Sequence, residues 1–208
     1  MELIKYVILG IIQGLTEPLP ISSSGHLLIF RELFNTNMFN DLNFEVMVNF
    51  GSFIAILIIF WKDIVRLVTN FFKYLFADKK DKKKYNEDFK YCMLIVVGSI
   101  PVGIIGLIFK DKIEAFASVK EVAFALLITA LALFIVKNSK GKKKDNEITY
   151  KDAIIIGLFQ MCALLPGLSR SGMVLVGCLL CGLNRESSLK YTFMLYFPVS
   201  VASFGLSS

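Results

Sequence analysis

The chain has 208 residues, 55% of them hydrophobic, with a mean hydropathy of +0.64 and a net charge of +6. This composition excludes an ordinary soluble domain and a disordered chain, and it indicates a polytopic membrane protein. The length allows one membrane domain over residues 1–208, with about half a dozen membrane segments.

The first apolar segments, 3–15 and 19–30, are too short to span a bilayer. Pro18 and Pro20 interrupt them, so we expect a re-entrant helix–loop–helix pair. Residues 44–61 form the first apolar run that is long enough to span.

Two basic stretches bracket the middle of the chain. Residues 62–90 carry nine Lys and Arg residues, and residues 137–151 carry six. The positive-inside rule predicts that both are cytoplasmic loops. The apolar runs 91–109 and 119–136 between them predict a hairpin of two spans, and we expect Pro101 to kink the first. We interpret the lysine runs as topology signals that also attract anionic lipid, in preference to nucleic acid.

The last part of the chain repeats the order of the first. Segments 152–165 and 173–183 are again short, and Pro166 and Gly167 lie at the break. They predict a second re-entrant pair, and residues 189–206 predict a further span.

A motif is written twice, 147 positions apart. The recurring residues are Gly10, Gln13, Ser22, Ser24 and Gly25, matched by Gly157, Gln160, Ser169, Ser171 and Gly172. Because three spans separate the copies, we expect an inverted-topology repeat whose two loop tips meet near the bilayer midplane. The first repeat covers about 1–137 and the second about 150–208. The second repeat lacks counterparts of the last two helices of the first repeat.

The second loop has the chemistry of an anion site. Arg170 is a permanent cation whose planar fork suits phosphate oxygens, and it stands at the start of a short predicted helix, where free N–H groups favour anions. The first loop repeats the predicted geometry, so the two together have room for a diphosphate. The predicted substrate-binding residues are Ser22, Ser24, Gly25, Ser169, Arg170, Ser171 and Gly172.

Glu17 has the opposite charge, which makes sense beside an anion if a divalent cation bridges the two. Gln13 lies one helical turn earlier and can face the same point, so we expect Gln13 and Glu17 to hold Mg²⁺ or Ca²⁺. His26 is the single histidine of the chain and can act as an acid, base or nucleophile near neutral pH. A motif serine as nucleophile, with His26 as its base, is the alternative.

The stretch from Gln13 to His26, together with Pro166 to Gly172, resembles the undecaprenyl-diphosphatase family of bacitracin-resistance proteins. The resemblance implies a multi-pass enzyme of the bacterial cytoplasmic membrane, with its site facing the extracytoplasmic side. It also implies removal of one phosphate from undecaprenyl diphosphate, which recycles the lipid carrier of cell-wall synthesis.

The resemblance further implies that the catalytic residues are Glu17, Ser23, His26 and Arg170. One departure is Val174, where the family usually has threonine. Two alternatives stay open: a polyprenyl-phosphate transporter or flippase, because inverted repeats also describe transporters, and an inactive, shortened relative. The expected partners are the polyprenyl diphosphate substrate and membrane lipid, and homo-oligomerisation stays open.

Overall fold

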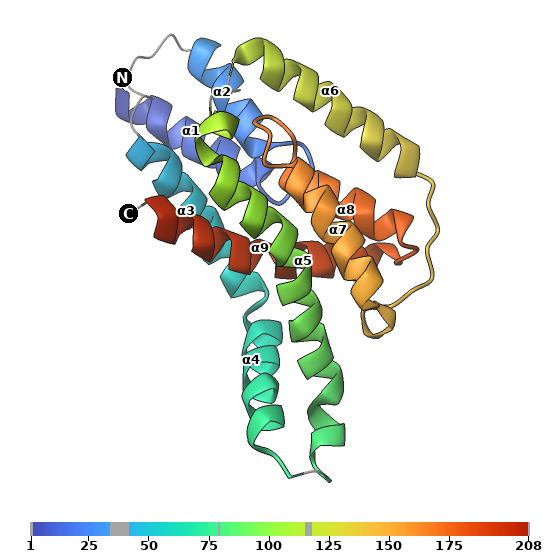
Figure 1. The fold of residues 1–208 in the computed structure, drawn as a ribbon. Helices are drawn as coiled ribbons and strands as arrows, with labels where there is room; N and C mark the ends of the chain where they lie inside the picture. Colours follow the sequence, from blue (N-terminus) through green and yellow to red (C-terminus); the bar gives the residue numbers. More distant parts are fainter. Residues whose placement is uncertain (1, 34–41, 79, 115–117, 208) are drawn as a thin grey trace.

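The structure is a computed structural model, and it describes residues 2–33, 42–78, 80–114 and 118–207. Within these ranges the regular secondary structure is helical, apart from an isolated bridge between Lys143 and Leu183. Figure 1 shows the helices packed into one body, from which a hairpin of two helices extends. The predicted all-helical class is therefore confirmed.

The chain begins with two helices joined by a turn, α1 over Glu2–Thr16 and α2 over Ser23–Leu33. The turn contains two prolines, which have no backbone N–H and cannot continue a helix. Ser22 ends the turn in the left-handed conformation, with φ at 65°. Helix α2 therefore begins four residues later than the predicted segment 19–30, because Pro20 still belongs to the turn.

Helix α3 covers Leu42–Ile59, and α4 covers Trp61–Phe76. Phe60 between them has φ −97° and ψ 12°, and the two helix axes differ in direction by 76°. The prediction of a loop at 62–90 is therefore wrong, since α4 and the first turns of α5 fill most of this range. Charge alone had defined that loop, whereas apolar residues such as Leu67, which is buried, recur there at helical spacing.

Helix α5 runs from Lys82 to Glu114 without ending at its proline. The residue with non-helical dihedral angles is Phe109, with φ −114° and ψ 15°, rather than Pro101. Pro101 packs beside α7, where a Cβ on Gly157 would lie 3.1 Å from its ring. Neighbouring helices commonly compensate for a proline within a membrane helix.

Helix α6 covers Val119–Val136, as the sequence predicted. Ser118 and Glu121 form a capping box at its start, because each side chain bonds to the other's backbone N–H. Helices α5 and α6 are long and apolar enough to cross a membrane, and α3 with α4 would add a third crossing if the bent pair were one span. These helices support a membrane protein.

The last three helices follow a connection that contains the short helix η2, Asp145–Glu147. They are α7 (Tyr150–Cys162), α8 (Arg170–Leu180) and α9 (Arg185–Ser207). Their predicted counterparts were 152–165, 173–183 and 189–206. Helix α8 begins earlier than predicted because Ser169 caps it by accepting the N–H of Gly172.

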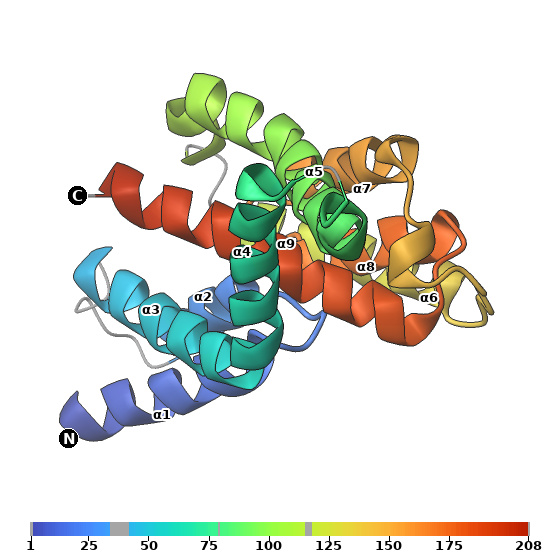
Figure 2. The ribbon, with the colours of Figure 1, turned by 90° about the horizontal axis from the view of Figure 1, so that it is seen from below.

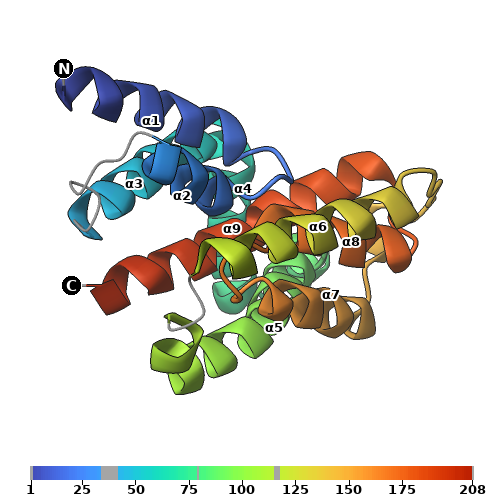
Figure 3. The same cartoon turned by 90° about the horizontal axis from the view of Figure 1, so that it is seen from above.

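Helix α9 lies at the centre of the molecule. Figures 2 and 3 show it between the group α1 to α3 on one side and α5 with α7 on the other. The main core lies where α5, α7, α8 and α9 meet, and α5 and α7 approach so closely that a Cβ on Gly157 would lie 2.5 Å from the Gly98 carbonyl oxygen. This contact requires glycine.

Lys190 connects three elements at the end of the molecule that carries the basic connection. Its Nζ lies 3.5 Å from Asp63 Oδ1 in α4 and 3.0 Å from Asp145 Oδ2 in η2. Burial alone would raise the pKa of Asp145, but the hydrogen bond and charge of Lys190 outweigh it and hold the pKa below its usual value.

Candidate active site

An ion pair joins the two loops that the sequence singled out. Arg170 Nη2 lies 3.2 Å from Glu17 Oε1, and the Glu17 side chain is only 10% exposed. The guanidinium of Arg170 also lies over the ring of Tyr196, 4.5 Å from its centroid, which is the geometry of a cation–π contact. The structure therefore brings Glu17 and Arg170 together from opposite ends of the chain.

Both oxygens of Glu17 have partners. While Oε1 faces Arg170, Oε2 accepts hydrogen bonds from the Ser23 hydroxyl and, at 2.8 Å, from Gln13 Nε2. Gln13 Nε2 also donates to Asn49 Oδ1 at 2.7 Å. Gln13 and Glu17 meet because they are one helical turn apart at the end of α1. Three donors therefore fix the position of this carboxylate.

The two loops also touch through their backbones. Ser171 Oγ donates to the Leu19 carbonyl oxygen at 3.2 Å. A Cβ on Gly172 would lie 3.0 Å from the Pro20 carbonyl oxygen. A side chain at position 172 would push the loops apart, so glycine allows the approach that forms the ion pair.

The two motif copies start their helices in the same way. In each, the first serine accepts the N–H of the motif glycine, and its Oγ lies 3.4 Å from the Oγ of the second serine. The residues are Ser22, Ser24 and Gly25 in the first copy and Ser169, Ser171 and Gly172 in the second. The first serine of each copy is buried, so it holds the loop, while the second serine remains accessible to a ligand.

His26 lies one turn into α2. Its Nδ1 is 2.8 Å from the Ser22 carbonyl oxygen. A carbonyl oxygen only accepts, so Nδ1 carries the proton and neutral His26 presents the lone pair of Nε2. The one hydroxyl proton of Ser23 is directed at Glu17. The geometry therefore gives Ser23 a carboxylate as its proton acceptor, where the sequence had suggested His26.

The predicted metal ligands were Gln13 and Glu17. In the residues that the structure describes, no three His, Cys, Asp or Glu side chains gather as a metal cluster. The Oε1 of Gln13, however, is buried and has no hydrogen-bond partner. This carbonyl oxygen and the Glu17 carboxylate are the hard oxygen ligands that Mg²⁺ and Ca²⁺ prefer, and a Mg²⁺ site commonly takes its remaining ligands from water and substrate phosphates. The residues present fit such an ion.

Sequence reasoning missed several residues that support the site. Asn49 holds Gln13, Tyr196 carries Arg170, and Thr129 Oγ1 accepts the N–H of Ser169 at 3.2 Å. Asn49 and Thr129 are polar side chains inside predicted spans, which is a signal of function or of a specific partner. That signal was present in the sequence, but it did not show which loop each residue contacts.

One helix, α6, lies behind both loops. A Cβ on Gly25 would lie 3.4 Å from the Val122 side chain, and a Cβ on Gly167 would lie 2.8 Å from the Val122 Cα. Gly167 has φ +91°, which also favours glycine there. With the Thr129 bond, α6 fixes the position of the loop before α8 and of the start of α2.

Val174, the departure from the family pattern, lies in the second turn of α8. It is 1% exposed and belongs to the main core. In this chain the position contributes packing to the core, and a valine is well suited to it.

The fold and the site define an integral membrane protein in which two interrupted helical segments, far apart in sequence, bring an arginine against a carboxylate and two helix N-termini. The chain belongs to the bacitracin resistance protein BacA family, whose model matches residues 6–208.

Several similar proteins carry the name undecaprenyl-diphosphatase. The chain is 45% identical over 206 residues to undecaprenyl-diphosphatase 2 of Bacillus thuringiensis, an alignment that covers 99% of this chain and 75% of the relative. It is 45% identical over 204 residues to undecaprenyl-diphosphatase of Oceanobacillus iheyensis, covering 97% and 73%. For undecaprenyl-diphosphatase 1 of Halalkalibacterium halodurans the identity is 41% over 203 residues, covering 97% and 72%. The chain therefore spans about three quarters of the length of these relatives.

Proposed function

We propose that this chain is a membrane phosphatase that hydrolyses undecaprenyl diphosphate to undecaprenyl phosphate and phosphate. This activity recycles the cell-wall lipid carrier and confers bacitracin resistance. Membership of the family supports the reaction. The observation that supports the site is the contact of Glu17 with both Arg170 and Ser23.

Substrate binding follows from charge. Arg170 and the N–H groups at the starts of α2 and α8 hold the diphosphate, because both favour anions. The accessible hydroxyl of Ser24 adds a hydrogen bond, and that of Ser171 adds one when it turns away from the Leu19 carbonyl oxygen. The serine caps hold the starts of α2 and α8 in place before the reaction, and Tyr196 holds Arg170. Donors fixed in this way stabilise the charge that develops on the phosphoryl group.

In the first step Ser23 Oγ bonds to the terminal phosphorus while its proton passes to Glu17. The bond from that phosphorus to the bridging oxygen breaks, and the lipid monophosphate leaves. In the second step water attacks the phosphoserine and its proton passes to His26 Nε2. Inorganic phosphate leaves as Ser23 takes its proton back from Glu17, which restores the hydroxyl, and His26 releases the proton that came from water to the solvent.

A divalent cation, Mg²⁺ or Ca²⁺, would be held by Glu17 and Gln13, and it would neutralise charge on the phosphate oxygens. The unpartnered Oε1 of Gln13 supports this assignment.

The proposed membrane arrangement has two re-entrant pairs, α1 with α2 and α7 with α8, entering a bacterial cytoplasmic membrane from opposite sides as an inverted repeat. The matching serine caps of the two loops support the repeat. The positive-inside rule assigns the basic segments to the cytoplasmic side, and the family resemblance implies that the site opens to the extracytoplasmic face.

Phosphate release from a polyprenyl diphosphate in detergent tests the function. Arg170→Ala should abolish it, and Arg170→Lys should restore little, because lysine keeps the charge but lacks the planar fork. Arg185→Ala is the control, because Arg185 lies beyond the C-terminal end of α8 and bonds to the Lys137 carbonyl oxygen. Full activity of Arg170→Ala would remove the arginine from the mechanism, and an inactive wild-type chain would refute the function.

A further inference from the structure

The orientation of α4 sets it apart from the other apolar helices. It leaves α3 at Phe60 with a change of direction of 76°. The 18 residues of α3 extend for about 27 Å, close to the thickness of a bilayer's hydrocarbon core. If α3 crosses the bilayer, a helix at this angle to it lies close to the membrane plane.

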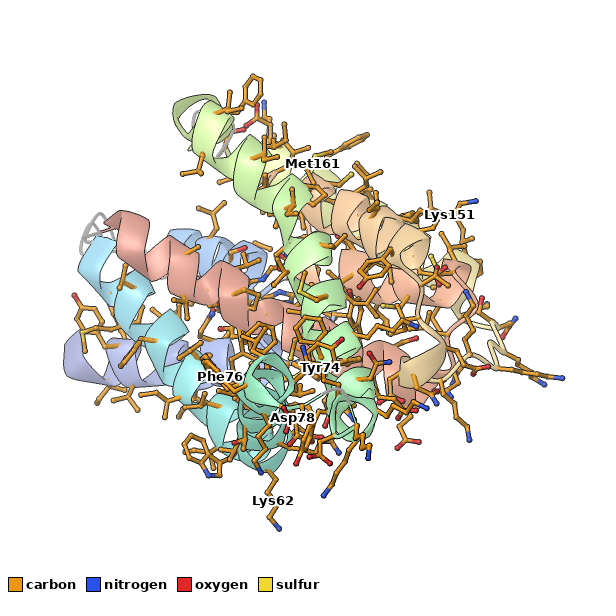
Figure 4. All side chains as sticks on the ribbon, turned by 60° about the horizontal axis from the view of Figure 1, so that its bottom comes forward. Lys62, Tyr74, Phe76, Asp78, Lys151 and Met161 are labelled. Atoms are coloured by element: carbon orange, nitrogen blue, oxygen red, sulfur yellow. The ribbon has the colours of Figure 1, made fainter. Side chains whose placement is uncertain are left out.

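The side chains of α4 divide into three faces. One face packs on α5: Phe71 and Tyr74 stack on Phe89 with centroids 5.3 and 4.0 Å away, and Leu67 is buried. A second face is basic and carries Lys62, Arg66 and Lys73. Figure 4 shows Lys62 pointing away from the body of the molecule.

The third face is apolar and exposed, and we call it the α4 stripe. Its residues recur every three or four positions, which places them on one side of the helix. They are Trp61, Val65, Val68, Phe72 and Leu75. Each is between 42% and 56% exposed in the part of the chain that the structure describes. A contiguous apolar stripe of this kind marks an interaction surface.

The neighbouring charge indicates the partner. The basic face of α4 borders the stripe, and Lys82, Lys83 and Lys84 follow at the start of α5. Anionic lipid headgroups attract such a cluster. A symmetric contact with a second copy of the chain would instead bring the two basic faces together, which like charges oppose.

We propose that α4 lies in the headgroup interface of the leaflet at which α3 ends. The α4 stripe faces the acyl chains, and Lys62 and Lys73 face anionic headgroups, while Arg66 pairs with Asp63 and Asp88. A helix with one apolar face, one basic face and a tryptophan is the type that binds in this plane. The helix thereby secures the α4–α5 hairpin, which otherwise extends from the body (Figure 1).

Trp61 makes a direct test available, because it is the single tryptophan of the chain. In vesicles of phosphatidylcholine and phosphatidylglycerol, lipids brominated near the headgroup should quench it. The double variant Trp61→Phe/Phe72→Trp moves the probe three turns along the stripe. We expect similar quenching at both positions, since a helix in the membrane plane keeps a constant depth.

A matched control places the probe on the other helix of the same hairpin. Glu87 is exposed, and it neighbours Asp88, which bonds to Asn70 of α4. In Trp61→Phe/Glu87→Trp, aqueous acrylamide should quench at least about twofold more than in the Phe72→Trp variant. Replacing Lys62 and Lys73 with glutamate should reduce the lipid quenching, and raising the salt concentration should do the same in the wild-type sequence.

Three results would overturn the proposal. Equal acrylamide quenching at positions 72 and 87, without lipid quenching, would place the hairpin in water. Quenching that moves from shallow to deep bromine positions between residues 61 and 72 would make α4 a continuation of the span. Protection that requires a high protein-to-lipid ratio would assign the stripe to a second copy of the chain.

Discussion

Arg170 Nη2 and Glu17 Oε1 lie 3.2 Å apart, although 153 positions separate the two residues in sequence. This ion pair joins the two loops, and its carboxylate also accepts a hydrogen bond from the Ser23 hydroxyl. The proposed mechanism therefore makes stability and catalysis depend on the same charge.

Glu17→Gln should affect both stability and activity. The amide keeps the size of the side chain but removes the charge and leaves Arg170 unpaired. Removing one partner of a largely buried pair is destabilising, and we expect a loss of about 1–3 kcal/mol together with at least a 100-fold fall in phosphate release. Thermal melting in detergent and a phosphate assay measure the two effects. Glu186→Gln, at the exposed start of α9, is the control and should change neither.

Ser23 and Ser24 are adjacent serines that differ in their contacts. Ser23 donates to Glu17, whereas Ser24 lies 3.4 Å from Ser22 Oγ. If Ser23 is the nucleophile, Ser23→Ala should lower kcat by about 1000-fold or more, and Ser24→Ala by less than about tenfold. If Ser23→Ala and Ser24→Ala had equal activity, the assignment of Ser23 as the nucleophile would be wrong.

Gly172→Ala tests how closely the loops must approach. The new Cβ would lie 3.0 Å from the Pro20 carbonyl oxygen. Overpacking of this kind typically costs about 1–3 kcal/mol, and here it should also lower activity by separating Arg170 from Glu17. Gly14→Ala is the matched control, because nothing lies within 4 Å of its Cβ position. A Gly172→Ala protein with unchanged melting and activity would show that the contact is not needed.

The contact of Lys190 with Asp145 predicts a pH dependence of stability. The pKa of Asp145 is lowered in the folded protein, so folding favours the carboxylate. The resulting stabilisation is present above the unfolded pKa of about 3.9 and is lost as the pH falls through the lower, folded pKa. The pair is partly exposed, so its contribution is below about 1 kcal/mol.

Comparing apparent melting temperatures of the wild-type sequence and Asp145→Asn between pH 7 and pH 3 measures this effect. The difference should be largest near pH 7 and should shrink as the pH approaches 3. A difference that grows on acidification would contradict the direction of the pKa shift.

Much of the fold was predictable because apolar runs of membrane length have few structural alternatives. The bounds of α6 were predicted to the residue. The error at 62–90 arose because lysine content was taken to mean loop, whereas the apolar residues between the lysines follow helical periodicity. Predicting α4 required the period of the pattern as well as its charge.

The site was predictable as a set of residues but not as a network. The family resemblance implied that Glu17, Ser23 and Arg170 belong to one site. It could not show that Glu17 accepts from Ser23, because that contact depends on how the turn after α1 directs each side chain. Nothing in the sequence marked Tyr196 as a site residue, since aromatic residues are common in membrane helices.

Helix α6 touches both loops, through Val122 on each side and through Thr129 behind Ser169. One helix therefore positions both halves of the proposed diphosphate site. A molecule that bound between α6 and the two loops would displace both halves of the proposed site at once, without competing with the substrate for the phosphate-binding groups.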